Sequence, residues 1–342
     1  MSDSSKSILL VGYKLGDPKK TGGFIVYTQN ILKDLKELGI EHELLSTNTQ
    51  FYKNIPHMFI AVVIEFFKKF RKYDHISLHA TTNHLPILGS IFIFFGKMFG
   101  KTISVKKTAG RFHREYESFD PIRRWLTRYV LKNADLVFFE TKYLVEYFKH
   151  FNKKTYWYPN IRRNPNFEYK PKEYKKRFAF ISLVAVSKGI DELLEVSNML
   201  DSSYTIDIYG KTLEDKYSDD YFEKYKASYK GSLSSQEVQE KLKEYDVIVL
   251  PSHEEGYPGI FIEAFSYGIP VLTTTLQPIK EIVFHNVNGI LVEPKDLKSL
   301  HKGFLAFNDE NYQNMSRDAY DSFENFDSFK QTKKLVSLIN AI

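Results

Sequence analysis

The chain has 342 residues, no cysteine, and 48 Lys and Arg residues against 42 Asp and Glu residues. The lack of cysteine excludes disulfide bonds and thiolate metal sites, which is typical of a cytoplasmic protein. The length predicts two domains, because a single core of this size would be unusually large.

The first predicted elements are a short buried strand, a Gly-rich loop and a helix. The strand spans Ile8 to Gly12, no signal peptide is expected before it, and the loop runs from Lys20 to Gly23. The helix that follows has apolar residues on one face and ends at Gly39. This order occurs in many nucleotide-binding domains, so by itself it does not identify a ligand.

Two apolar stretches follow, residues 58–70 and 85–99. Both fall short of the roughly 20 residues that cross a bilayer. One interpretation is ordinary core helices. The other is an interfacial patch, in which Phe residues lie beside a group of cations that attracts an anionic membrane; this group is Lys68, Lys69, Arg71 and Lys72.

Charge is unevenly distributed along the chain. Residues 1–165 hold 27 Lys and Arg against 14 Asp and Glu, a net +13, whereas residues 166–342 hold 21 against 28, a net −7. A basic surface that only keeps the protein soluble is one interpretation. The other is a first domain that faces anionic lipid or a phosphate-bearing acceptor, which is favoured by two groups of cations: the four above, and Lys106, Lys107, Arg111 and Arg114.

The expected domain boundary lies in residues 160–176, where Pro165, Pro171 and many polar residues interrupt the hydrophobic periodicity. Strands alternate with helices on both sides of it, which predicts an α/β protein with parallel sheets of βαβ units. We expect domains at 1–163 and 164–325, followed by a terminal helical segment at 326–342.

The most informative stretch is a strand, a loop and a helix between Val247 and Gly268. Glu255 lies in the loop and Glu263 lies in the helix, eight residues apart. Open α/β sheets bind ligands at the carboxyl ends of their strands, so both carboxylates are expected to face such a crevice.

The loop between them indicates the ligand. Gly256 and Gly259 remove side chains where backbone amides can approach a diphosphate, with Tyr257 and Pro258 between them. An ionised carboxylate only accepts hydrogen bonds, which suits the hydroxyl groups of a sugar or a ribose. The pattern therefore predicts a nucleotide-sugar site.

This segment resembles the E-x7-E signature of the family 4 retaining glycosyltransferases. Further motifs of that family occur before and after this segment, in the order in which the family has them. They lie at Lys188–Ile190, Ile208–Gly210, Lys230–Leu233, Tyr245–Ser252, Asn288–Gly289 and Leu291–Val292. The resemblance implies the GT-B architecture, with two Rossmann-like domains that face each other across a cleft. It also implies an acceptor-side first domain, in which Gly22 and Gly23 face the cleft, a donor-binding second domain and a terminal helix that returns to the first.

The function implied is transfer of a hexose from a UDP- or GDP-linked donor to a glycan or lipid-linked acceptor, with retention and without a cofactor. By the resemblance, Glu255 binds a donor-sugar hydroxyl, Glu263 binds the ribose, and Lys188 stabilises the departing diphosphate. The other residues expected to bind the donor are Gly256, Tyr257, Pro258, Gly259, Gly210, Ser232 and Leu233.

The sequence departs from the family pattern in two places. The family's Arg, five or six residues before its Lys, is replaced by Leu183 and Ser182. The family's His-Gly pair is replaced by Ala109 and Gly110. His113 is therefore the candidate catalytic histidine, with His79 as a second candidate, and Gly110 and Arg111 are expected to line the cleft.

No Asp-x-Asp pair and no metal-binding His pattern occurs in the sequence, which predicts transfer without a metal. Two alternatives stay open: a nucleotide-sugar epimerase or phosphorylase on the same fold, and a non-catalytic module that binds a polyanion. No nucleic-acid-binding motif is present. The expected location is the cytoplasm, including the inner face of the plasma membrane.

Overall fold

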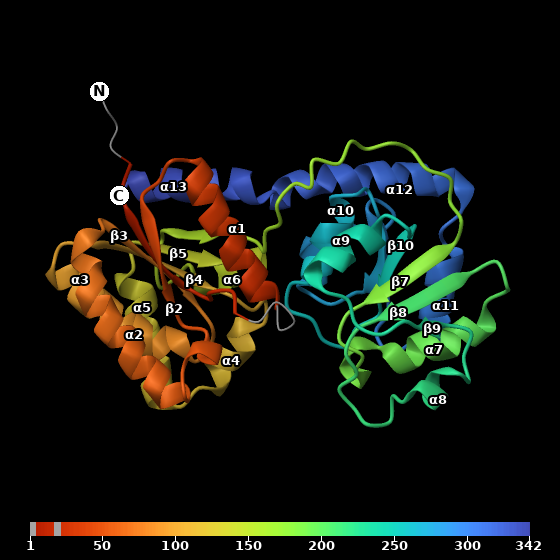
Figure 1. Ribbon diagram of the computed structural model, residues 1–342, viewed down its shortest axis with the longest axis horizontal. Helices are drawn as coiled ribbons and strands as arrows, with labels where there is room; N and C mark the ends of the chain where they lie inside the picture. Colours follow the sequence, from red (N-terminus) through yellow and green to blue (C-terminus); the bar gives the residue numbers. More distant parts are fainter. Residues whose placement is uncertain (1–4, 17–21) are drawn as a thin grey trace. The chain divides into compact units, whose positions relative to one another are not determined.

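A computed structural model describes residues 5–16 and 22–342 (Figure 1). The chain divides into two compact units. The first comprises Met1–Arg163 together with Phe326–Ile342, and the second comprises Asn164–Asn325. Residues 1–4 and Lys20 and Thr21 of the Gly-rich loop lie outside the described residues.

The first unit contains a six-stranded parallel sheet in the order β2-β1-β3-β4-β5-β6. Its strands are β1 Ile8–Gly12, β2 His42–Ser46, β3 His75–Ala80, β4 Thr102–Lys107, β5 Leu136–Phe139 and β6 Thr155–Trp157. Helices α1 Gly23–Glu37, α2 Ile55–Lys69, α3 His84–Met98, α4 Phe112–Ser118, α5 Pro121–Asn133, α6 Lys142–Phe148 and α13 Ser328–Asn340 surround it.

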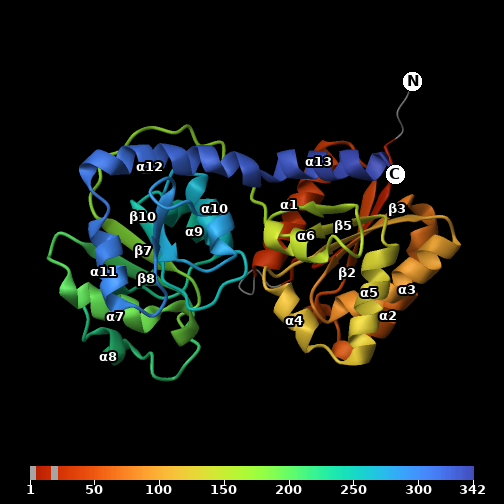
Figure 2. The same ribbon diagram turned by 180° about the vertical axis from the view of Figure 1, so that it is seen from behind.

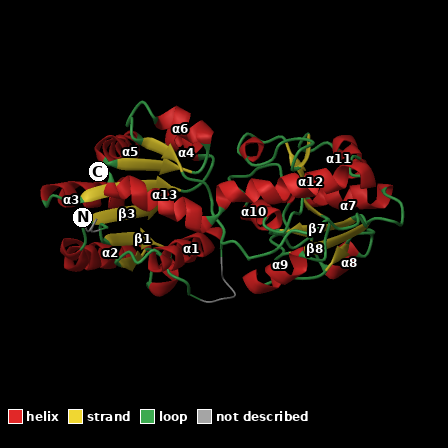
Figure 3. Cartoon of the chain, turned by 90° about the horizontal axis from the view of Figure 1, so that it is seen from above, coloured by secondary structure: helices red, strands yellow, loops and turns green. Residues whose placement is uncertain are grey.

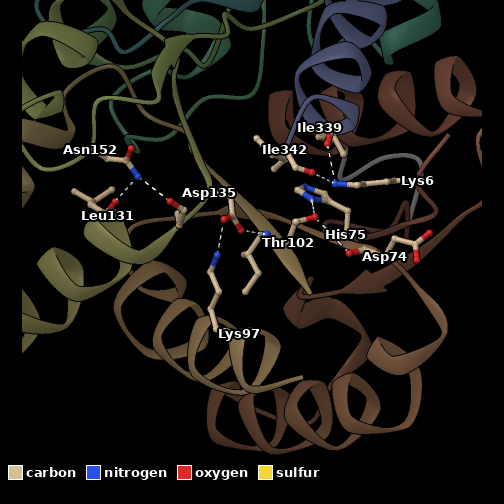
Figure 4. Close-up of polar contacts among 12 residues, drawn as sticks. Lys6, Asp74, His75, Lys97, Thr102, Leu131, Asp135, Asn152, Ile339 and Ile342 are labelled. Atoms are coloured by element: carbon tan, nitrogen blue, oxygen red, sulfur yellow. Dashed lines mark hydrogen bonds and ion pairs between the residues drawn. The ribbon is translucent and has the colours of Figure 1, made fainter. Parts of the chain in front are cut away.

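Successive residues of β1 face opposite sides of this sheet, as the strand geometry requires. Leu9 and Val11 pack in a core with α2, α3 and α5, whereas Ile8 and Leu10 pack in a core with α1 and α13. The terminal helix α13 is therefore part of the first unit. Lys6 fixes the end of this helix. Its Nζ donates to the carbonyl of Ile339 at 3.3 Å (Figure 4). Its backbone N–H donates to Asn340 Oδ1 at 3.1 Å.

The second unit is built around another six-stranded parallel sheet, in the order β12-β11-β10-β7-β8-β9 (Figure 2). Its strands are β7 Arg177–Ile181, β8 Thr205–Tyr209, β9 Ser228–Tyr229, β10 Val247–Leu250, β11 Val271–Thr274 and β12 Gly289–Val292. Its helices are α7 Ile190–Met199, α8 Asp219–Phe222, α9 Ser235–Leu242, α10 Gly259–Phe265, α11 Leu297–Leu305 and α12 Asp309–Ser322.

Helices α7 and α11 pack together on one face of the second sheet, and α10 and α12 pack together on the other (Figure 3). The predicted α/β class, with two parallel βαβ sheets, is confirmed. The helix expected at about 260–267 begins one residue earlier and ends at Phe265. In the described part of the chain, no helix is both long and apolar enough to cross a membrane.

Candidate functional site

A topological switch point lies between two neighbouring strands of the second sheet. The chain continues from β7 to β8 on one side, and from β10 to β11 on the other. The loops at the carboxyl ends of β7 and β10 therefore leave the sheet toward opposite faces, to α7 and to α10. Such a divergence opens the crevice in which open α/β sheets bind ligands.

Lys188 and Glu255 come into direct contact at this switch point. Lys188 Nζ lies 2.6 Å from Glu255 Oε1, and the two side chains are 22% and 9% exposed. The hydroxyl of the buried Ser252 donates to the same carboxylate oxygen at 2.9 Å. A carboxylate this far from water is held by both partners, because an unpaired buried charge is costly.

Further hydrogen bonds connect the loop after β10 to the elements around it. Thr274 Oγ1 donates to the carbonyl of Ser252 at 2.7 Å, and the backbone N–H of His253 donates to the carbonyl of Ser187 at 2.9 Å. His253 Nε2 also lies 2.9 Å from Glu192 Oε1 on α7. Sequence reasoning missed these supporting residues. Ser252 falls within a recognised motif, but Glu192 and His253 are 61 positions apart and give no local signal.

Two glycines allow the backbone to approach closely here. Gly189 has φ +71°, and a Cβ on it would lie 2.0 Å from the carbonyl oxygen of Pro251. Gly210, after β8, has φ +150°, and a Cβ there would lie 1.6 Å from the carbonyl oxygen of Ser182. Neither position accepts a side chain without a shift of the backbone.

The other residues predicted to bind the donor are spread over two neighbouring regions of the second unit. Tyr257 and Pro258 are buried just before α10. Gly256 and Gly259, on either side of this pair, are partly exposed. Glu263 lies in the second turn of this seven-residue helix and is partly exposed. The two predicted carboxylates thus lie on a loop and on the helix that follows it.

Gly210, Ser232 and Leu233 lie at the carboxyl ends of β8 and β9. The backbone N–H of Gly210 donates to the carbonyl of Gly231 at 2.9 Å, which joins the two loops. Ser232 is exposed. Leu233 lines a cavity of about 410 Å³ together with side chains from the first two turns of α9.

The remaining candidates lie in the first unit. Gly22 is the N-cap of α1 and Gly23 is its first residue. Both are exposed, and a Cβ on either would meet no described atom within 4 Å. Packing therefore does not explain these two glycines.

His113 lies in α4, with its ring against Tyr143 and Tyr147 at centroid distances of 4.9 and 5.8 Å. Burial lowers the pKa of its imidazole. Gly110 is buried and Arg111 is partly buried just before this helix. The preceding Ala109 has φ +95° and donates its N–H to Glu140 Oε2 at 2.9 Å.

The expected surface group of Lys106 and Lys107 is wrong, because each is only 1% exposed. Lys106 Nζ lies 3.6 Å from the centre of the Tyr27 ring and donates to the carbonyl of Pro159 at 3.3 Å. Lys107 Nζ lies 3.8 Å from Glu115 Oε2. Burial lowers the pKa of Lys106 to about 7 and that of Lys107 to about 8.

His79 lies inside the first unit, 1% exposed, where Nε2 is 3.0 Å from Ser77 Oγ. Burial holds the pKa of its imidazole well below the usual value. The second histidine candidate is therefore a core residue. Within residues 5–16 and 22–342, no three His, Asp or Glu side chains form a group that could hold a metal ion.

Residues 162–322 match the family model described as glycosyl transferases group 1. The match includes Lys188, Glu255 and Glu263, and it covers nearly all of the second unit. The second unit is therefore similar to a group 1 glycosyltransferase domain.

Among curated relatives, a 41.2 kDa protein of the cps region of Klebsiella pneumoniae is 30% identical over 123 residues, 36% of this chain and 34% of the relative. The putative teichuronic acid biosynthesis glycosyltransferase TuaC of Bacillus subtilis is 29% identical over 80 residues, 23% and 20% of the two chains. The aligned parts thus span about a third or less of these relatives' own lengths.

HepE of Anabaena, solved in complex with UDP, is similar in structure with a TM-score of 0.75 and 15% identity over 98% of this chain and 100% of HepE. Its complex with UDP-glucose gives a TM-score of 0.71. At this identity the likeness shows the fold alone. The fold is that of the GT-B glycosyltransferases, as the family resemblance implied.

Proposed function

We propose that the chain is a retaining glycosyltransferase that moves a hexose from a UDP-linked donor to a glycan acceptor. The observation that carries this proposal is the contact of Lys188 with the buried Glu255 at the switch point of a group 1 glycosyltransferase domain. One cation and one hydrogen-bond acceptor there match the two parts of a nucleotide-sugar, its diphosphate and its sugar hydroxyls.

The two side chains exchange partners when the donor binds. In the structure, Lys188 neutralises Glu255. A diphosphate offers Lys188 more negative charge, so the ammonium turns to it and releases Glu255 to accept a hydrogen bond from a sugar hydroxyl. Ser252 still donates to the carboxylate and keeps it in place. Glu263 accepts hydrogen bonds from the ribose.

Transfer forms a bond from the acceptor hydroxyl oxygen to the anomeric carbon and breaks the bond from that carbon to the diphosphate. The hydroxyl attacks the face from which the diphosphate leaves, and a departing phosphate oxygen takes its proton. The configuration is thereby retained. Lys188 acts most strongly as charge grows on the leaving group, and no covalent enzyme intermediate or metal is needed.

The donor and the acceptor are proposed from two comparisons. HepE binds UDP and UDP-glucose on the same fold, which favours UDP over GDP. The relatives from the Klebsiella cps region and from teichuronic acid biosynthesis favour a polysaccharide acceptor, free or lipid-linked.

The test is incubation of the protein with UDP-hexoses and GDP-hexoses, with and without a panel of glycan acceptors, followed by proton NMR of the products. Transfer from a UDP-sugar with retained anomeric configuration is expected. Conversion of the donor without any acceptor would indicate an epimerase, and dependence on inorganic phosphate would indicate a phosphorylase. An inverted product would contradict retention. Binding of polyanions with no turnover of any donor would favour the non-catalytic module.

A further inference from the structure

The outer surface of the first unit carries apolar stripes on three helices. Helix α3 has a single charged side chain, Lys97, and apolar residues around its whole circumference. Its inner side packs on the sheet, but Ile87, Phe94 and Met98 remain 44%, 57% and 58% exposed. These positions are spaced seven and four residues apart, so they lie on one side of the helix.

The helices on either side continue this surface. On α2, Ile60, Ile64 and Phe67 form an exposed stripe at helical spacing. On α5, Ile122 and Trp125 are exposed. Nine of the 22 exposed large apolar side chains among the described residues lie on α2, α3 and α5, which together have 43 residues. This is a concentration on one helix layer and not the scatter of single residues that is normal for a surface.

A groove between α3 and α5 lies within this surface, which we call the α2–α3–α5 face. It has a volume of about 330 Å³ and is lined by Ile91, Phe94, Phe95, Trp125, Leu126 and Tyr129. Helices α2, α3 and α5 cover the same side of the first sheet (Figures 1 and 2). The apolar stripes therefore share one layer.

The three helices of this face carry an excess of positive charge. Together α2, α3 and α5 hold seven Lys and Arg against one Glu. Among the four cations singled out from the sequence, Lys68 and Lys69 pair with Glu65 and Glu43, so they contribute less than expected. Arg71 lies 4.7 Å from the centre of the Phe99 ring, at the end of α3.

We propose that the α2–α3–α5 face docks on an anionic lipid bilayer, with Phe94 and Trp125 in the interfacial region. Apolar side chains bordered by Lys and Arg match the acyl boundary and the anionic headgroups of such a bilayer. A second copy of the chain fits poorly, because a two-fold interface would place the same positive surface against itself. This docking is separate from the donor site, which lies in the other unit.

Trp125 provides a direct probe, because the chain has only two Trp residues. Trp157→Phe leaves Trp125 as the sole tryptophan. The substitution removes the hydrogen bond from Trp157 Nε1 to the carbonyl of Glu140. On addition of vesicles of phosphatidylglycerol and phosphatidylcholine, the emission of Trp125 should shift to shorter wavelength. Vesicles of phosphatidylcholine alone should cause a much smaller shift. No shift with anionic vesicles at low salt would overturn the proposal.

Sedimentation with the same vesicles tests the apolar residues in the full chain. Phe94→Gln with Trp125→Gln should lower partitioning by at least about tenfold. Leu213→Gln with Leu305→Gln, at exposed positions of the second unit, should leave partitioning unchanged. Both variants should keep the wild-type melting temperature and UDP affinity.

Unchanged partitioning of the first variant would overturn the proposal, as would equal binding to both kinds of vesicle. A dimer of the wild type in light scattering that dissociates on Phe94→Gln with Trp125→Gln would show that the face binds a second copy instead.

Discussion

Lys188 is the residue on which the proposed chemistry depends most. Its ammonium contacts Glu255 at 2.6 Å and is proposed to contact the diphosphate during transfer. Because the charge on the leaving group grows in the transition state, the side chain should contribute more to rate than to binding.

We expect Lys188→Ala to lower kcat by about 100-fold while donor affinity falls by less than about tenfold. Lys188→Arg is the matched control, because it keeps the positive charge, and it should retain more of the rate than the Ala variant. Steady-state kinetics with a fixed acceptor, together with equilibrium binding of the donor, separates the two quantities. Normal turnover of Lys188→Ala would show that another cation fills this role.

The buried Lys106 makes the free energy of unfolding of the first unit depend on pH. Burial lowers its pKa from 10.5 to about 7. Between these values the unfolded chain binds more protons than the folded chain, so the free energy of unfolding rises with pH across this window. Below pH 7 both states are protonated, and the full cost of the buried charge is present.

From pH 7 to pH 8.5, this group should add about 1.5 kcal/mol to the free energy of unfolding of the first unit. Lys106→Met should lack that increment. Urea unfolding followed by tryptophan fluorescence measures it, because Trp125 and Trp157 both lie in the first unit. Equal pH dependence in the wild type and the variant would contradict the lowered pKa.

At the scale of elements, the two loops of the switch point are held together by the backbone as well as by side chains. Gly189 is the N-cap of α7 and lies at φ +71°, against the carbonyl of Pro251. A methyl group there would push the β7 and β10 loops apart and carry Lys188 away from Glu255.

Gly189→Ala should therefore weaken UDP binding by more than about tenfold, in addition to the roughly 1–2 kcal/mol that a left-handed alanine costs. Gly39→Ala is the control, because Gly39 has φ +69° and a methyl group on it would meet no described atom within 4 Å. It should lose stability by a similar backbone cost and keep its UDP affinity. If both variants bind UDP like the wild type, the close approach of the loops has no role in the site.

Local sequence patterns predicted the positions of helices and strands well, but they predicted poorly which side chains contact each other in the folded chain. Apolar runs and glycines located the strand, loop and helix around Glu255, because periodicity and turn chemistry act over a few residues. The burial of Lys106 was missed, because Tyr27 and Tyr158 pack against it from distant parts of the sequence. Lys107 is buried because Phe112 and Glu115 of the following helix α4 lie against it. The contact of His253 with Glu192 was also missed, because it joins the loop after β10 to α7, and these two segments meet only in the folded unit. The sequence also did not settle whether the apolar stripes on α2 and α3 are exposed, because such apolar stretches are typical of core helices as well.

At the scale of the whole molecule, transfer is expected to be independent of metal. Lys188 is proposed to supply the positive charge that a cation would otherwise provide to the diphosphate. Transfer should therefore continue at an unchanged rate in excess EDTA, measured by release of UDP in the presence of acceptor. Loss of transfer in EDTA that Mg²⁺ or Mn²⁺ restores would refute this electrostatic mechanism.

The switch point of the second unit is proposed to bind a nucleotide-sugar through its carboxylates and Lys188, and every other step depends on this binding. Calorimetric titration with UDP tests it most directly, on the wild type, on Glu263→Gln and on the control Glu310→Gln in α12. We expect one UDP per wild-type chain, a loss of about 1.5–3 kcal/mol in binding free energy for Glu263→Gln, and no change for the control. Absence of UDP binding by the wild type, or equal affinity of the wild type and Glu263→Gln, would contradict the proposed site.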